Sequence, residues 1–155
     1  MKVASFYDFL EIQPLGNNAF MLRDEKSTVK TMEDLMDLNR RIVQMGEELG
    51  KPVCATCDVH FLNPEDEVYR RILMAGQGFS DADQQAPLYL RTTEEMLKEF
   101  EYLGPDKAEE VVITNTRMIA DMCERIAPVR PDKCPPVIED SDDCLLYTSP
   151  SPRDA

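Results

Sequence analysis

The feature that most constrains the fold is an amphipathic helical pattern that leads directly into a β-rich segment. Residues 32–49 carry apolar side chains at three- and four-residue spacing, which is the period of one helix face: Leu35, Leu38, Ile42, Met45 and Leu49. Thr31 is placed to cap the start of this helix, with Asp34 three residues on, and Gly50 to end it. Shortly afterwards the sequence predicts a strand over 53–59.

The rest of the chain divides into shorter predicted elements. In chain order these are a strand over 7–15, a short extended piece over 19–23, a helix from 64 to about 75, a loop over 76–90, a short helix from 92 to about 102 and a longer helix from about 106 to 125. The order of strand, helix, strand and helix is typical of an α/β fold with parallel strands. So few strands cannot close a sheet or barrel, so we expect the chain to be a piece of a larger protein.

The charge balance limits the partners that this chain can bind directly. Its 155 residues have a net charge of −13. A surface this acidic repels phosphate backbones, so we expect contacts with nucleic acid to lie elsewhere in a larger enzyme. No apolar run approaches the roughly 18–20 residues of a membrane span, and the N-terminus lacks the apolar core of a signal peptide. We therefore expect no membrane partner and a cytoplasmic location.

The cysteines, at positions 54, 57, 123, 134 and 144, are expected to be free thiols, because their number is odd and nothing indicates secretion. Cys54 and Cys57 form a Cys-x-x-Cys pair, but a redox pair works at a helix N-terminus, whereas this pair lies in a predicted strand. Their odd spacing places the two sulfur atoms on opposite faces of the strand. Both are therefore predicted to fill the core.

Asp58 and His60 are the candidate metal ligands. Side chains alternate along a strand, so these two share one face at the carboxyl end of the predicted strand, while Val59 points into the apolar layer with Cys57. Ligand sites of α/β proteins lie at that end, and a carboxylate beside an imidazole suits a divalent metal. His60 is the only histidine, so the site is incomplete. The pattern also allows an alternative, in which Asp58 caps a turn and His60 makes one hydrogen bond.

Four stretches of the sequence resemble one protein family: YDFLEIQPLGNN, NRRIVQMGEELGKPVCATCDVHFLNPEDEVYRRIL, PLYLRTTEEMLKEFEYLG and EEVVITNTRMIADM. Together they are similar to the C-terminal part of the PHP domain in the PolC-type DNA polymerase III alpha subunit, over roughly residues 6–140. The run from Gly50 to Leu73 carries the most weight, because it is long and in order.

The resemblance implies a fold and a metal site. The PHP domain is a distorted (βα)7 barrel with a metal cluster at the carboxyl ends of its strands, and this chain is expected to hold its last strand–helix units and a C-terminal helical segment. The family's Asp-x-His motif matches Asp58 and His60, which are therefore expected to bind a divalent metal, zinc or manganese. Residues 9–13 match a strand of the barrel wall, and Cys57 stands where the family commonly has glycine.

The resemblance also implies partners and a division of the chain. The parent enzyme uses magnesium for polymerisation and is expected to bind DNA, dNTPs and replisome subunits such as the sliding clamp through parts that are missing here. Residues 1–125 are expected to be PHP domain, 126–143 a proline-rich and acidic linker toward the polymerase core, and 144–155 a non-native tail. The catalytic carboxylates of polymerisation and proofreading are absent from the sequence, so the isolated fragment is predicted to be inactive.

Three functions compete at this stage. The first is a fragment of the bacterial replicative DNA polymerase. The second is a stand-alone PHP-family metal-dependent phosphoesterase, although small hydrolases of this kind are similar to the sequence only around Asp58 and His60. The third is a non-catalytic interaction module that docks a partner through its acidic surface.

Overall fold

The computed structural model describes residues 3–129 and 131–132. The chain divides into two units, Met1–Cys123 and Glu124–Ala155, and every helix and strand of the described residues belongs to the first. The predicted tail over 144–155 and most of the predicted linker over 126–143 lie outside the described residues, so both stay predictions.

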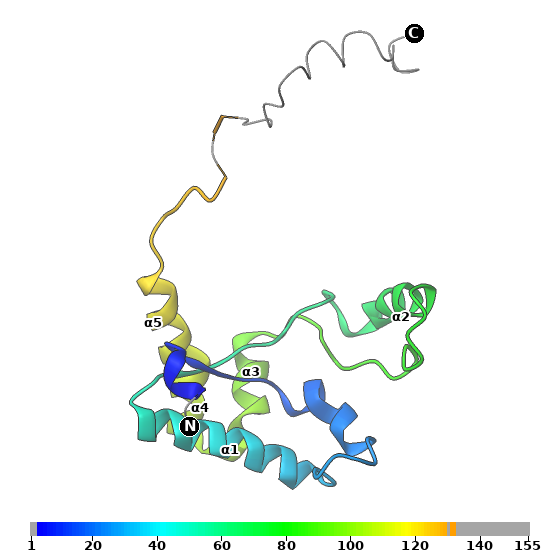
Figure 1. Cartoon of the computed structure of the whole chain (residues 1–155), viewed down its shortest axis with the longest axis horizontal. Coiled ribbons are helices and arrows are strands. Elements are labelled where there is room, and N and C mark those ends of the chain that lie inside the picture. The colour runs from blue at the N-terminus through cyan, green and yellow to red at the C-terminus, as the bar shows by residue number, and fades with distance from the viewer. Residues whose placement is uncertain (1–2, 130, 133–155) are drawn as a thin grey trace, which may run out of the picture. The chain divides into compact units, whose positions relative to one another are not determined.

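Two short parallel strands form the sheet of the described part of the chain (Figure 1). Strand β1, Leu10–Ile12, pairs with β2, Val53–Ala55, so that Leu10 lies opposite Val53. The predicted parallel pairing is confirmed, but both strands are much shorter than the predicted ranges 7–15 and 53–59. Neither strand can continue to its predicted end, because Pro14 has no amide hydrogen to donate and Asp58 adopts a left-handed φ of 52°. The expected PHP-type barrel stays a proposal.

Helix α1, Met32–Leu49, has the predicted bounds and caps. The Thr31 hydroxyl accepts a hydrogen bond from the Asp34 amide, and the Asp34 carboxylate accepts one from the Thr31 amide, which completes a capping box. Gly50 ends the helix in the left-handed region at a φ of 63°. The helix packs against both strands (Figure 1) and so covers one face of the sheet.

The prediction of an extended piece over 19–23 is wrong. A 3-10 helix, η2, spans Leu15–Leu22 instead. The backbone amide of Asn17 donates to the carbonyl of Pro14 at 3.0 Å. The buried side chain of Leu15 packs with Val29 and Leu35, and Asn17 Nδ2 donates to the distant carbonyl of Cys57 at 3.1 Å. The short apolar pattern did not reveal these tertiary contacts.

Among the remaining helices η1 was not predicted, and the others follow the predicted order with one irregularity. They are η1 (Ala4–Phe6), η3 (Pro64–Asp66), α2 (Glu67–Gly76), α3 (Thr93–Glu99), η4 (Glu101–Leu103), α4 (Pro105–Glu109), the π-helical turn η5 (Glu110–Thr114) and α5 (Asn115–Met122). The single helix predicted over 106–125 is thus interrupted by a π turn and ends at Met122. The predicted capping box of Thr92 and Glu95 is present at the start of α3.

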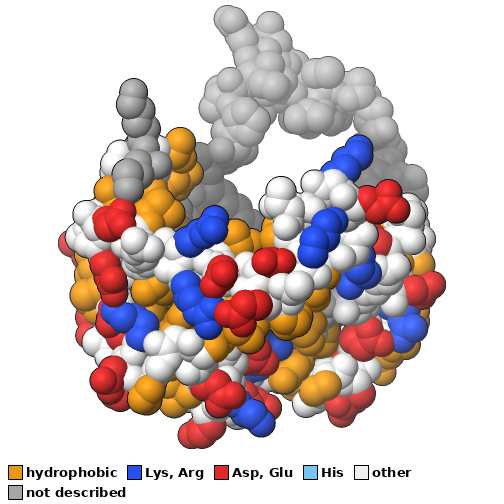
Figure 2. Space-filling model, turned by 90° about the horizontal axis from the view of Figure 1, so that it is seen from below, with side chains coloured by type: hydrophobic (Ala, Val, Ile, Leu, Met, Phe, Trp, Pro, Cys, Tyr) orange, Lys and Arg blue, Asp and Glu red, His pale blue; other side chains and the backbone are white. Residues whose placement is uncertain are grey.

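The core lies between the sheet and the C-terminal helices. Its buried residues are Ile12, Val43, Val53, Ala55, Met96, Phe100, Ala108 and Val111. A smaller cluster of Leu15, Val29 and Leu35 fills the space beside η2 and α1. On the face shown in Figure 2, basic side chains are scattered among acidic ones rather than gathered in one patch. In the part of the chain that the structure describes, no helix is both long and apolar enough to span a membrane.

Candidate metal-binding turn and its cleft

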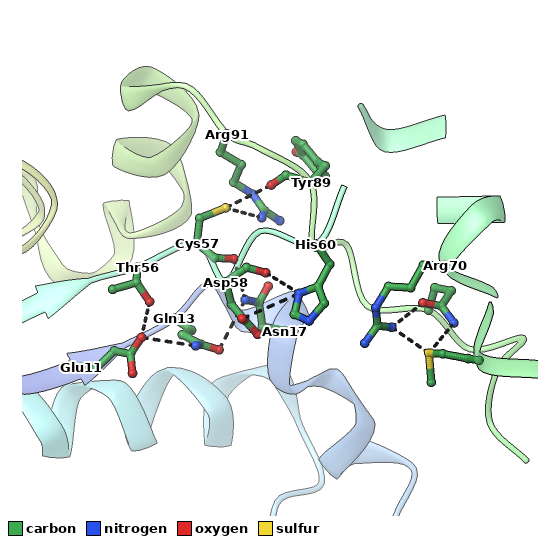
Figure 3. A network of polar contacts seen from close by, with 12 residues as sticks. Glu11, Gln13, Asn17, Thr56, Cys57, Asp58, His60, Arg70, Tyr89 and Arg91 are labelled. Carbon is green, nitrogen blue, oxygen red and sulfur yellow. Dashed lines mark hydrogen bonds and ion pairs between the residues drawn. The ribbon is translucent and has the colours of Figure 1, made fainter. Parts of the chain in front are cut away.

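Asp58 and His60 lie in a turn that follows β2 (Figure 3). His60 Nδ1 is 3.0 Å from the backbone oxygen of Asp58 and 3.7 Å from its carboxylate oxygen Oδ1. Strand alternation does not bring them together, because β2 ends at Ala55. Asp58 adopts a left-handed φ, so a turn achieves the proximity that the sequence had assigned to a strand face.

Contacts with a distant segment hold this turn. The amide of His60 donates to the carbonyl of Leu88 at 2.8 Å, and the amide of Leu90 donates to the carbonyl of Phe61 at 3.1 Å. Phe61 and Tyr89 form an isolated parallel bridge. The loop predicted over 76–90 therefore ends in a short extended stretch that pairs with the residues beside His60.

Cys57 joins the turn to a buried arginine. Its thiol donates to the carbonyl of Tyr89 at 3.1 Å and accepts a hydrogen bond from Arg91 Nη1 at 3.4 Å (Figure 3). The Arg91 side chain is 2% exposed, pairs with Glu99 at 3.3 Å and lies 4.3 Å from the centre of the Tyr89 ring. Burial opposes the charge of Arg91, but Cys57, Glu99 and Tyr89 outweigh it and raise the pKa of the guanidinium. Arg91 thus stays charged and ties α3 to the turn.

The interpretation of the cysteine pair as core filler agrees with the surroundings of Cys57, which packs against the main core. For Cys54 it stays a prediction, because this residue is only partly buried; both thiols are free. Burial, followed by the nearby negative charge of Glu11, raises the pKa of the Cys54 thiol, which disfavours the reactive thiolate. The expectation for Val59 is wrong, because this side chain is 46% exposed rather than packed in the apolar layer.

A cleft of about 390 Å³ opens beside the turn. Its lining includes the ionisable residues Asp58, His60, Arg23, Arg70 and Asp81. The guanidinium of Arg70 donates to Gln85 Oε1 and to the sulfur of Met74. Sequence reasoning missed Arg70, because α2 carries it at an unremarkable position of an amphipathic helix.

Asn17 is a further lining residue that the sequence did not reveal as functional. Its Nδ2 donates to the carbonyl of Cys57 at 3.1 Å, which fixes the backbone immediately before Asp58. The only available signal was the Gly16-Asn17-Asn18 string, which reads as turn chemistry.

The turn fits part of a metal site. If Nδ1 of His60 donates its hydrogen to the Asp58 carbonyl, Nε2 carries the lone pair that a metal requires. Within residues 3–129 and 131–132 no group of three or more histidine, cysteine, aspartate or glutamate side chains is placed to hold a metal ion. Asp58 and His60 are therefore two candidate ligands of a site that needs further donors.

Comparison with known proteins gives strong matches among curated sequences, although no family model matches. The chain is 58% identical to the DNA polymerase III PolC-type of Clostridium perfringens over 142 residues, which is 92% of this chain and 10% of that protein. It is 53% identical over 143 residues to the protein of the same name from Caldanaerobacter subterraneus, again 92% and 10% of the two chains. The chain is 46% identical over 152 residues to the protein of the same name from Halalkalibacterium halodurans, which is 96% of this chain and 10% of that protein.

These matches first define a class: the chain is homologous to one segment of much longer bacterial DNA polymerases. More particularly, the relatives that contain this segment are PolC-type DNA polymerases III, in agreement with the likeness seen in the sequence. The chain spans 10% of the length of these relatives.

Proposed function

We propose that this chain is a segment of a bacterial replicative DNA polymerase of the PolC type, and that DNA-templated DNA synthesis is the activity of the whole protein. The observation that carries this proposal is the 58% identity over 92% of the chain to a PolC-type polymerase. The relatives support this reading over a stand-alone PHP phosphoesterase, because those reported above all carry the name of the polymerase.

Within that protein the segment is proposed to be a structural part of the PHP domain with a corner of its metal site. Asp58 and His60 would hold a divalent ion, zinc or manganese, which in such a site supplies Lewis-acid activation of water or of a phosphate oxygen. Magnesium, DNA, dNTPs and the sliding clamp are assigned to the rest of the polymerase, which we place in the cytoplasm. The three-part division at 125 and 143 belongs to this proposal as well.

A segment exchange tests the function. Residues 6–122 of this chain replace the homologous segment in the Clostridium perfringens relative, and primer extension is measured on the purified chimera. We expect template-dependent synthesis within about tenfold of the unmodified enzyme, since core packing tolerates substitution when volume and pattern are kept. A control chimera carries the same segment with Phe100→Asp, which buries a charge at a fully buried position and should abolish folding. A well-folded but inactive first chimera would contradict the proposal.

The isolated chain supplies the complementary test. Purified 155-residue protein is expected to show no template-dependent incorporation, because the catalytic carboxylates of the parent are not in its sequence. Incorporation above background by protein free of contaminating polymerase would show that the assignment as a non-catalytic segment is wrong.

A further inference from the structure

The amide of Asn17 has one atom whose hydrogen-bonding capacity is unused. Asn17 is 8% exposed, and its Nδ2 faces two oxygens, the carbonyl of Cys57 at 3.1 Å and Oε1 of Gln13 at 3.4 Å. The Gln13 amide is oriented in turn by Glu11, whose carboxylate accepts from Nε2 at 3.4 Å. A carboxylate only accepts, so the whole chain of contacts fixes which end of each amide is nitrogen.

The unused atom must therefore be an oxygen. Exchanging the amide nitrogen and oxygen of Asn17 would set oxygen against oxygen at both contacts. Oδ1 is buried and has no hydrogen-bond partner among the described residues. An unpaired buried acceptor is unfavourable, so it is expected to meet a donor or a cation in the working protein.

The position of Asn17 points to a cation. Asn17 lines the same cleft as Asp58 and His60, and Figure 3 shows its side chain beside both. We propose that Oδ1 of Asn17 is a third ligand, beside Asp58 and His60, for one divalent metal ion in this cleft. This inference rests on the proposed metal role of Asp58 and His60. A side-chain amide oxygen, a carboxylate and an imidazole form a mixed oxygen and nitrogen set suited to manganese.

The fold holds these three residues in place without a metal. Asn17 is tied to the residue before Asp58 through the Cys57 carbonyl. The neighbouring Gly16 lies so close to Pro87 that an added Cβ would be 2.6 Å from its Cγ. The next residue, Leu88, accepts the amide hydrogen of His60. Both walls of the cleft are therefore fastened to the same loop, which is the pre-organisation that a ligand set requires.

The positive charges of the cleft do not rule the site out. Arg23 and Arg70 line it, but Asp58 and Asp81 offset them, and the Arg70 guanidinium is engaged by Gln85. Binding by the isolated chain is expected to be measurable but modest, because three ligands leave the rest of the coordination shell to water.

Titration of the full 155-residue chain with MnCl₂, followed by electron paramagnetic resonance of free Mn²⁺, tests this inference. Manganese is the probe because zinc would also bind thiolates. The variants are Asn17→Leu, which removes the oxygen, and Asn17→Asp, which adds a charge to it. His60→Ala reports on the metal site itself. Asn115→Leu is the matched control, since Asn115 is equally buried at 8% and also donates to one backbone carbonyl, that of Val53 at 2.8 Å.

We expect Asn17→Leu to weaken Mn²⁺ binding by about tenfold or more, Asn17→Asp to strengthen it, and Asn115→Leu to leave it unchanged. Unchanged binding in Asn17→Leu, or an equal loss in Asn115→Leu, overturns the role of Asn17. If His60→Ala loses Mn²⁺ binding while Asn17→Leu keeps it, Asp58 and His60 remain the proposed ligands and only the role of Asn17 is overturned.

Two further outcomes are decisive. Circular dichroism shows whether Asn17→Leu folds. If it does not, Asn17→Asp is the deciding variant: tighter Mn²⁺ binding supports the inference, and unchanged binding overturns it. Absence of Mn²⁺ binding in the wild type, or binding that survives His60→Ala, overturns both the third ligand and the proposed metal pair, while the segment-exchange test of polymerase function remains independent.

Discussion

Gly46 allows α1 and β2 to pack closely against each other. It lies in the last turn of α1 and is buried where the helix meets β2. A Cβ there would collide with a methyl group of Val53 and lie 2.9 Å from the carbonyl oxygen of Lys51. Glycine is otherwise a poor helix residue, so its presence reflects the close approach of helix and strand rather than a local preference.

The first prediction concerns Gly46→Ala. The better helix propensity of alanine contributes about 1 kcal/mol, whereas overpacking costs about 1–3 kcal/mol, so the free energy of unfolding is expected to fall by roughly 1 kcal/mol. Denaturant unfolding measures the change. Gly76→Ala is the control, because nothing lies within 4 Å of the added Cβ, and it should be neutral or stabilising. A stabilised Gly46→Ala variant would show that the contact between α1 and β2 is looser than described.

At the scale of elements, caps and side-chain contacts determine where helices begin and change pitch. The box of Thr31 and Asp34 sets the first residue of α1. The π turn of η5 is accompanied by one tertiary and one local contact. Directly after it, Asn115 Nδ2 donates to the Val53 carbonyl at 2.8 Å, and within the helix the Thr116 hydroxyl donates to the carbonyl of Val112 at 2.7 Å. A local pattern predicts the cap but not the π turn.

The second prediction concerns the pH dependence of the α1 cap. Hydrogen bonds from the Lys30 amide, then from the Thr31 hydroxyl and amide, lower the pKa of Asp34. The folded state therefore favours the ionised form, and the resulting stability is present above about pH 4 and is lost as pH falls through the lowered pKa. The melting temperatures of wild type and Asp34→Asn are compared across this range. Their difference should be constant near neutrality and shrink in acid, and a pH-independent difference would contradict the role of the carboxylate.

Across the whole molecule, stability is expected to be uneven. Helix α1 buries Leu35, Asn39, Val43 and Gly46, whereas none of the ten residues of α2 is buried. Large side chains on α2 are exposed, among them Tyr69 at 65%, Ile72 at 62% and Leu73 at 66%. A helix of this length is marginal in water without tertiary packing, so α2 is held mainly by its ends and by the contacts of Arg70.

The third prediction follows from this difference. Amide hydrogen exchange of the isolated chain should be at least about tenfold faster in the middle of α2 than in the middle of α1, because α2 can open without disturbing the core. Mass spectrometry measures the exchange rates of the two helices. Repeating the exchange at several protein concentrations distinguishes protection by folding from protection by self-association. Equal protection of the two helices at the lowest concentration would mean that α2 is packed more firmly than its exposure indicates.

Elements whose signals are local could be predicted before the fold was known. The bounds of α1, the capping box at Thr92, the order of helices and strands and the parallel strand pairing depend on periodicity, caps and turn residues, which neighbours along the chain supply. The pair Asp58 and His60 was also identifiable, through the resemblance to the polymerase family. Its metal role stays a prediction.

Other features depend on contacts between residues far apart in the sequence, so they could be seen only in the folded structure. The helical form of η2 and the exposure of Val59 depend on what lies beside these residues in the fold, and no local pattern records that. The same holds for the site: Asn17 and Arg91 reach the turn through Cys57 and Tyr89, residues separated by 32 positions. A turn rather than a strand face brings Asp58 to His60, because the left-handed φ of Asp58 is stabilised by bonds from the loop ending at Leu90.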